Sequence, residues 1–97
     1  MAISVLISRK MSKEQQSATQ PYLRKLTILA KKQPGYLSGK LLTRYDDTEE
    51  HLIICSWKSI ADWERFNKLE ESREFHYLID QILVKPTIHK LYVDNSE

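Results

Sequence analysis

The chain has 97 residues, of which 41% are hydrophobic and 29% are charged, and its formal net charge at pH 7 is +2. These values are typical of one globular domain with a modest core, and they exclude an intrinsically disordered chain. The small net charge, without a clustered basic stripe, argues against a nucleic-acid-binding surface. We therefore expect a single domain over residues 1–97, with its core at about 2–93 and a frayed tail at 94–97.

The cysteine content and the N-terminal stretch bear on where the protein resides. Cys55 is the only cysteine, which excludes a disulfide framework or a cysteine-based zinc site within the chain and fits a reducing cytoplasm. The N-terminus has no basic region ahead of its short apolar stretch, and no apolar run approaches the roughly 18 residues of a membrane helix. We expect a soluble, cytoplasmic protein that binds neither a membrane nor nucleic acid.

The first predicted element is a strand at 2–9, which is rich in β-branched residues and partly alternates between apolar and polar side chains. Ser12 followed by Gln15 matches a capping box at the start of a helix. Pro21 lacks a backbone N–H and interrupts the helical pattern. We therefore expect a short first turn and then a firm helix from about residue 21 to 32.

Pro34 and Gly35 end that helix, because proline cannot continue it and glycine supplies the turn. Two strands follow, at 36–45 and 51–58, and the polar turn 46–50 between them predicts a hairpin.

Two helices and a last strand complete the chain. Ser59 begins a helix that extends to about Lys68, and Ser72 begins another, which Pro86 ends. Residues 87–93 form the last predicted strand. The order β-α-β-β-α-α-β predicts an α+β, ferredoxin-like fold, in which a four-stranded antiparallel sheet carries the helices on one face.

The predicted strand 51–58 is apolar on both faces. Leu52 and Ile54 point to one face, whereas Ile53, Cys55 and Trp57 point to the other. A sheet with helices on one side should instead be polar on its other side.

The first and last predicted strands add further apolar residues to the uncovered face. Successive side chains of a strand point to opposite faces, so we assign Leu6, Leu91 and Val93 to the uncovered face and Ile3, Val5, Ile7 and Ile88 to the other. Scattered apolar surface residues are common, but a contiguous patch of several hundred Å² usually marks an interaction surface. We predict a homodimer formed through this sheet face.

Three stretches of the sequence are informative when taken together: KKQPGYLSGKLL, LIICSWKSIADWERF and SREF. A helix ending in P-G-[CY]-L-S, a strand ending in W-x-S, a further helix and an S-x-x-F stretch resemble the antibiotic biosynthesis monooxygenase (ABM) domain family over about residues 2–93. The resemblance implies a dimeric α+β barrel. Members of that family share the fold but differ in function. They include cofactor-independent monooxygenases of phenols, haem-degrading enzymes, enzymes that act on quinones and proteins without known activity, so the fold alone does not determine the function.

The haem-degrading branch of that family requires an asparagine late in the first strand, a second tryptophan about nine residues after the strand-ending one, and a histidine on the next helix. Here residues 2–11 contain no asparagine, Phe66 stands at the position of the second tryptophan, and Ile79 stands near that of the histidine. These departures argue against haem degradation. We expect no cofactor and no bound metal.

The resemblance leaves an aromatic cavity as the candidate site. A monooxygenase without a cofactor must bind an electron-rich phenol, help to remove its proton and exclude water. His76 is the candidate catalytic acid or base, because imidazole titrates near neutral pH. The alternative interpretation is a surface or hydrogen-bonded helix histidine.

Seven residues are the candidate substrate-binding set, as apolar walls or as polar groups that orient a phenolate: Trp63, Phe66, Phe75, Tyr22, Tyr36, Tyr77 and Arg44. Trp63 and Phe66, three residues apart on one helix, equally fit a structural core, and Tyr36 and Arg44 equally fit the rim of a dimer. Trp57 is interpreted as structural.

Two functions from different classes therefore stay open. The first is oxidation of an aromatic or quinone-like small molecule by an ABM-type protein. The second is a non-catalytic dimeric domain that binds a small apolar ligand.

Overall fold

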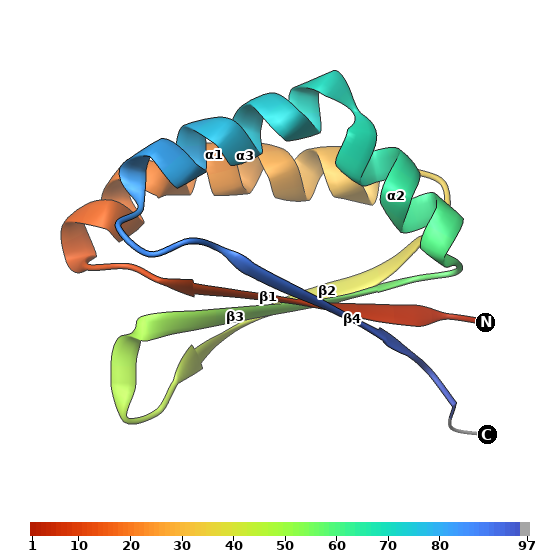
Figure 1. Ribbon diagram of the computed structural model, residues 1–97, viewed down its shortest axis with the longest axis horizontal. Helices are drawn as coiled ribbons and strands as arrows, with labels where there is room; N and C mark the ends of the chain where they lie inside the picture. Colours follow the sequence, from red (N-terminus) through yellow and green to blue (C-terminus); the bar gives the residue numbers. More distant parts are fainter. Residues whose placement is uncertain (96–97) are drawn as a thin grey trace.

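The computed structural model describes residues 1–95, and residues 96 and 97 of the predicted tail lie outside the described part. Its elements are β1 (Ile3–Lys10), α1 (Lys13–Lys31), β2 (Tyr36–Arg44), β3 (Asp47–Trp57), α2 (Ile60–Lys68), α3 (Glu70–Ile82) and β4 (Ile88–Val93). The strands form one antiparallel sheet in the order β2-β3-β1-β4, and the helices cover one face of it (Figure 1). The predicted α+β, ferredoxin-like fold is confirmed. No helix in the described part has both the length and the apolar composition needed to cross a bilayer.

Helix α1 is continuous, so the predicted interruption at Pro21 is wrong. Its start is as predicted, because the Ser12 Oγ accepts a hydrogen bond from the Gln15 backbone N–H at 3.2 Å and the Gln15 side chain accepts one from the Ser12 N–H at 2.9 Å. Proline at position 21 removes only the hydrogen bond to the carbonyl of Ser17. Both residues are exposed, so water can solvate that carbonyl.

Two other predicted boundaries shift. The β2–β3 turn is shorter than the predicted 46–50, because Asp47 already pairs with Arg44 in the sheet. Helix α3 begins at Glu70, two residues before the predicted start, and Ser72 is fully buried inside its first turn instead of capping it.

The register of β1 with β3 divides their side chains between two different environments. The side chains of β1 that face the helices lie opposite the apolar helix-facing residues of β3, in the pairs Ile3–Trp57, Val5–Cys55 and Ile7–Ile53. On the other face, Leu6 lies opposite Ile54 and Ser8 lies opposite Leu52. The sequence-based expectation that this strand is apolar on both faces is therefore confirmed.

The assignment of β4 to a face needs correction. Leu91 lies opposite Val5 and Val93 lies opposite Ile3, so both occupy the helix-covered face. Ile88 lies opposite Ser8, on the uncovered face. Alternation along one strand shows which side chains share a face. Only the register with the neighbouring strand shows which of the two faces that is. We call the uncovered face the open face; its apolar side chains are Leu6, Leu42, Leu52, Ile54, Ile88 and Tyr92.

An aromatic cluster fixes the corner where β3 passes into α2. Trp57, the last residue of β3, is fully buried, and the ring centroids of Phe66, Tyr36 and Trp63 lie 5.3, 5.4 and 6.0 Å from its own. These rings come from β2, β3 and α2, so the cluster joins three elements. We refer to these four residues as the aromatic cluster.

Gly35 connects the α1–β2 turn to the same corner. Its φ of +86° lies in the left-handed region, and its carbonyl accepts a hydrogen bond from the Lys58 N–H at 2.8 Å. A Cβ at this position would collide with the side chain of Asp62 in α2. Glycine is required here both by the backbone conformation and by the close approach of α2.

We predict that Gly35→Ala lowers the free energy of unfolding by about 1–2 kcal/mol from the left-handed backbone alone, and by more once Asp62 must move. Urea denaturation measures this change. Lys85→Ala, at an exposed residue of the α3–β4 connection, is the control and should change the stability by less than about 0.5 kcal/mol. Equal effects of the two substitutions would contradict the assignment of strain to Gly35.

Candidate functional site

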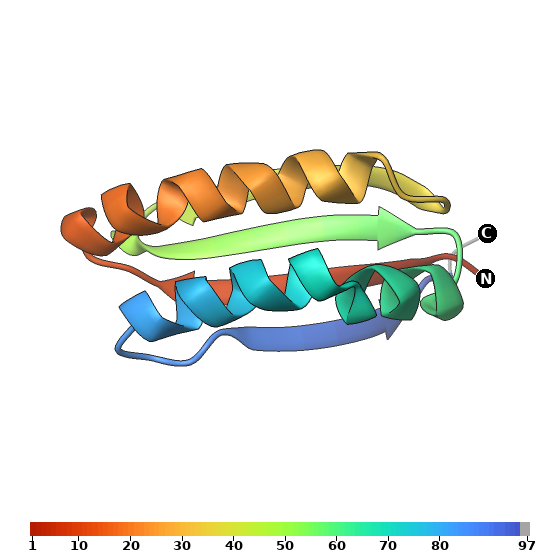
Figure 2. The same cartoon turned by 90° about the horizontal axis from the view of Figure 1, so that it is seen from above.

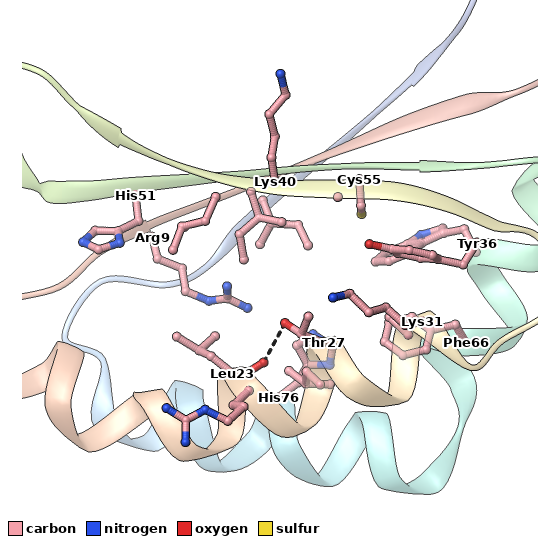
Figure 3. Close-up of a pocket in the computed structure, with 18 of the residues that line it drawn as sticks. Arg9, Leu23, Thr27, Lys31, Tyr36, Lys40, His51, Cys55, Phe66 and His76 are labelled. Atoms are coloured by element: carbon pink, nitrogen blue, oxygen red, sulfur yellow. Dashed lines mark hydrogen bonds between the residues drawn. The ribbon is translucent and has the colours of Figure 1, made fainter.

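A cavity of about 360 Å³ lies between the helices and the sheet (Figure 3). Figure 2 shows α1 running along the β2–β3 side of the sheet and α3 along the β1–β4 side. The wall includes side chains from the sheet strands β1, β2 and β3 and from all three helices. The volume falls in the range of ordinary small-molecule sites, about 300–1,000 Å³.

One end of the cavity is aromatic. All four members of the aromatic cluster line it. Trp57, interpreted from the sequence as structural, is therefore both the centre of the packing and part of the wall. Its indole Nε1 is buried and interacts with the Cys55 thiol.

The other end carries a buried cation that sequence analysis missed. Arg9 of β1 is 4% exposed and lies opposite His51 of β3, and Figure 3 shows its guanidinium directed from the sheet into the cavity. Its Nε donates to the Thr87 Oγ1 at 3.2 Å, and that hydroxyl donates to an Asp80 carboxylate oxygen at 3.1 Å. The alternation of Ile3, Val5 and Ile7, continued by one step, would have placed Arg9 on the same face.

The environment of Arg9 changes its acidity without removing its charge. Burial lowers the pKa of Arg9 to about 10, against a smaller opposing effect of Asp80. The guanidinium therefore stays protonated at neutral pH. The cavity has a permanently charged end and an aromatic end.

His76 of α3 lines the cavity between these ends, and its hydrogen bond fixes its tautomer. The ring Nδ1 lies 2.8 Å from the backbone carbonyl oxygen of Ser72. A carbonyl oxygen only accepts, so Nδ1 carries the proton and Nε2 of the neutral ring keeps its lone pair. Burial is the main reason that the pKa of His76 is lowered, which favours the neutral ring. The arrangement is that of a proton acceptor.

Tyr36 supplies a hydrogen-bond donor at the aromatic end. Burial, with a smaller effect of the Cys55 thiol, raises the pKa of Tyr36, so the hydroxyl keeps its proton at neutral pH. Gly39 makes room for it, because a Cβ at that position would lie only 2.6 Å from the Tyr36 hydroxyl oxygen. Figure 3 shows the Lys31 ammonium group entering the cavity from α1 close to this tyrosine.

The structure brings together four of the predicted site residues, His76, Tyr36, Trp63 and Phe66, on one cavity wall. The other four are not among the lining residues. Tyr22 and Phe75 stack on each other, 6.5 Å apart, between α1 and α3.

Arg44 lies at the β2–β3 turn, where its guanidinium pairs with Asp46 and Glu50. Tyr77 is 62% exposed and lines a second, shallower hollow together with His89. Within the described residues, no three His, Cys, Asp or Glu side chains are placed to share one metal ion.

We predict that the imidazole of His76 titrates below the ordinary histidine pKa of about 6.5. The unfolded chain then takes up this proton at a higher pH than the folded one. His76 therefore makes the stability fall as the pH drops below about 6.5, until the pH passes the lower pKa of the folded state. NMR titration, with resonances assigned by comparison with His76→Gln, measures the pKa. A midpoint at or above 6.5 would contradict the burial argument.

Comparisons with known proteins agree with this fold. Residues 2–78 match the family model named Antibiotic biosynthesis monooxygenase (ABM). A search of curated proteins gave no match.

Among solved structures, the chain is similar to Rv0793 from Mycobacterium tuberculosis, with a TM-score of 0.88, 13% identity, and coverage of 100% of this chain and 98% of that one. A conserved protein from Methanosarcina mazei has a TM-score of 0.87 at 17% identity, with 95% and 91% covered. SnoaB, a cofactor-independent oxygenase from Streptomyces nogalater, has a TM-score of 0.83 at 12% identity, with 99% and 95% covered. At these identities the structural likeness shows the fold alone, whereas the family model matches most of the sequence. The chain belongs to the antibiotic biosynthesis monooxygenase (ABM) family.

Proposed function

We propose that this protein is a cofactor-independent oxygenase or oxidase that acts on a phenolic or quinone-forming aromatic compound in the cavity. The observation that carries the proposal is the neutral His76, held by the Ser72 carbonyl in the tautomer of a base, on the wall of a largely aromatic and aliphatic cavity. Membership of the ABM family and the fold shared with the oxygenase SnoaB support it.

The proposed reaction begins with proton transfer. His76 Nε2 takes a proton from the bound substrate, and the Tyr36 hydroxyl donates a hydrogen bond to the oxygen that gains negative charge. The resulting anion transfers one electron to O₂, and the radical pair combines to a peroxide. With an anthrone as substrate, the peroxide loses water, so that anthrone and O₂ give a quinone and H₂O. The buried rings of Trp57, Trp63 and Phe66 keep bulk water away from the anion.

Oxygen uptake with a panel of anthrones, naphthols and hydroquinones tests the proposal. We predict turnover by the unmodified protein and a loss of about 100-fold or more in kcat for His76→Gln, because general-base catalysis typically contributes about 10²–10⁴-fold. KM should change far less, since the glutamine fills a similar space.

Tyr77→Phe is the control, because this exposed tyrosine on the same helix does not line the cavity and the substitution should leave most of kcat intact. If no member of the panel consumes oxygen while ligands still bind, the protein is instead the non-catalytic binding domain that the sequence also allows. Equal activity of His76→Gln and the unmodified protein would remove His76 from the mechanism.

For the quaternary structure, we infer that two copies pair through the open face. Leu6 and Ile54 lie at its centre on adjacent strands, and Leu42, Ile88 and Tyr92 towards its edges are 42%, 52% and 51% exposed. Leaving these side chains in water is unfavourable, and a second antiparallel sheet of the same composition would cover them. On the same face Lys40 lies opposite Ile54, Lys90 lies opposite Leu6, and Glu50 lies opposite Lys10, so both signs of charge border the apolar side chains.

We predict a dimer at micromolar concentration in analytical ultracentrifugation, and a monomer for Ile54→Lys, because the new ammonium group would be buried between the two sheets. Val84→Lys introduces the same charge at an apolar residue that is 87% exposed in the α3–β4 connection, so it should remain dimeric. A monomeric unmodified protein would contradict this arrangement.

A further inference from the structure

The charges on the cavity wall have one sign. Among the described residues that line it, every fully charged side chain is cationic, namely Arg9, Arg24, Lys31 and Lys40, and none is an aspartate or a glutamate. The sequence has 13 acidic residues, so their exclusion from this wall is a feature of the site and not of the composition. Figure 3 shows Lys40 directed away from the cavity, while Arg9 and Lys31 enter it.

The two terminal nitrogens of the Arg9 guanidinium have no hydrogen-bond partner among the described residues. Its Nε is occupied by Thr87, and this is the one hydrogen bond that the described residues give to the group. No carboxylate in the described part of the chain lies within ion-pair distance of it, because Asp80 is reached only through the Thr87 hydroxyl. The two terminal nitrogens form the fork that binds a carboxylate through two parallel hydrogen bonds.

A buried guanidinium without a directly paired anion costs stability, because its charge is removed from bulk water and the Asp80 carboxylate, linked through the Thr87 hydroxyl, compensates only part of that loss. A bound anion would supply the missing partner. The neighbouring His51 adds a second unsatisfied group, because its Nε2 is buried without a hydrogen-bond partner among the described residues. Buried polar atoms are normally satisfied, and a polar group bound at this end of the cavity would supply the partners that Arg9 and His51 lack.

The distance between the two ends sets the size of that occupant. On β3, His51 marks the charged end, and Cys55 lies next to the aromatic cluster. Four residues of an extended strand span about 13 Å.

We propose that the cavity takes an aromatic hydroxy acid, with its carboxylate on the Arg9 fork beside His51 and its fused rings against the aromatic cluster. This inference rests on the proposed function in that it names an acidic group on the same substrate. Binding can be measured without turnover, so the two proposals can fail separately.

Intrinsic fluorescence is a direct readout, because both tryptophans of the chain, Trp57 and Trp63, line the cavity. The probes are 6-hydroxy-2-naphthoic acid, its methyl ester and 2-naphthol, which share the ring system and the hydroxyl group and differ in the anionic group. We expect the acid to bind at least about tenfold more tightly than the ester and the naphthol, as one charge-assisted bidentate contact supplies this factor.

Arg9→Met should remove the preference for the acid and leave the Kd of 2-naphthol within about threefold. Lys25→Met, which removes the same charge from an exposed site on α1 outside the cavity, should retain the preference. The melting temperature of ligand-free Arg9→Met should equal or exceed that of the unmodified protein, because the unpaired buried charge is gone. A merely structural arginine would instead lower it.

Equal Kd values for the acid and its ester in the unmodified protein would overturn the inference, and so would a failure of all three probes to bind. Retention of the preference in Arg9→Met would also overturn it. If Arg9→Met does not fold, the comparison of the three probes on the unmodified protein still tests whether the cavity prefers the acid. Oxygen uptake by a neutral phenol without preference for the acid would refute this inference and leave the proposed function standing.

Discussion

The packing around Trp57 is the constraint on which the rest of the structure depends. This residue ends β3, is fully buried and contacts rings from β2 and α2, so it fixes the direction in which the chain leaves the sheet. Removing a buried tryptophan side chain typically costs about 3–5 kcal/mol, a large share of the stability of a small domain. The turn at Gly35 can approach α2 only because this corner is fixed. The same rings close one end of the cavity, so the packing that stabilises the fold also forms part of the site.

The cavity combines two contrasting environments within one small core. At one end the rings exclude water, and at the other a permanently charged guanidinium is held by a single hydroxyl. His76 lies between them with its protonation state and tautomer set by burial and by the Ser72 carbonyl. A ligand that satisfies both ends places its reacting ring beside this base. Binding orientation and proton transfer would then depend on the same few side chains, which are rigid because they project from a sheet and from packed helices.

The sequence was sufficient to predict the order of the elements, the capping box at Ser12 and the apolar residues on both faces of the third strand. Each of these features depends on residues that are close together in the chain. The continuity of α1 through Pro21 was missed, since an exposed carbonyl tolerates the lost hydrogen bond. Arg9 was missed because its burial depends on the β1–β3 register and on Thr87, 78 positions away in the chain. Tyr77 and Arg44 were chosen for their chemistry alone. Their placement outside the cavity follows from helix rotation and from ion pairs at the hairpin.

A crystal structure of the protein with bound 6-hydroxy-2-naphthoic acid would test the central claim most directly, namely that the space between α1 and the sheet is a ligand site with a charged and an aromatic end. It should show the carboxylate within hydrogen-bond distance of the terminal nitrogens of Arg9, the rings against Trp57 and Phe66, and the hydroxyl within reach of His76 or Tyr36. A ligand bound elsewhere, for example in the hollow beside Tyr77, or one lying in the cavity with its carboxylate away from Arg9, would contradict it.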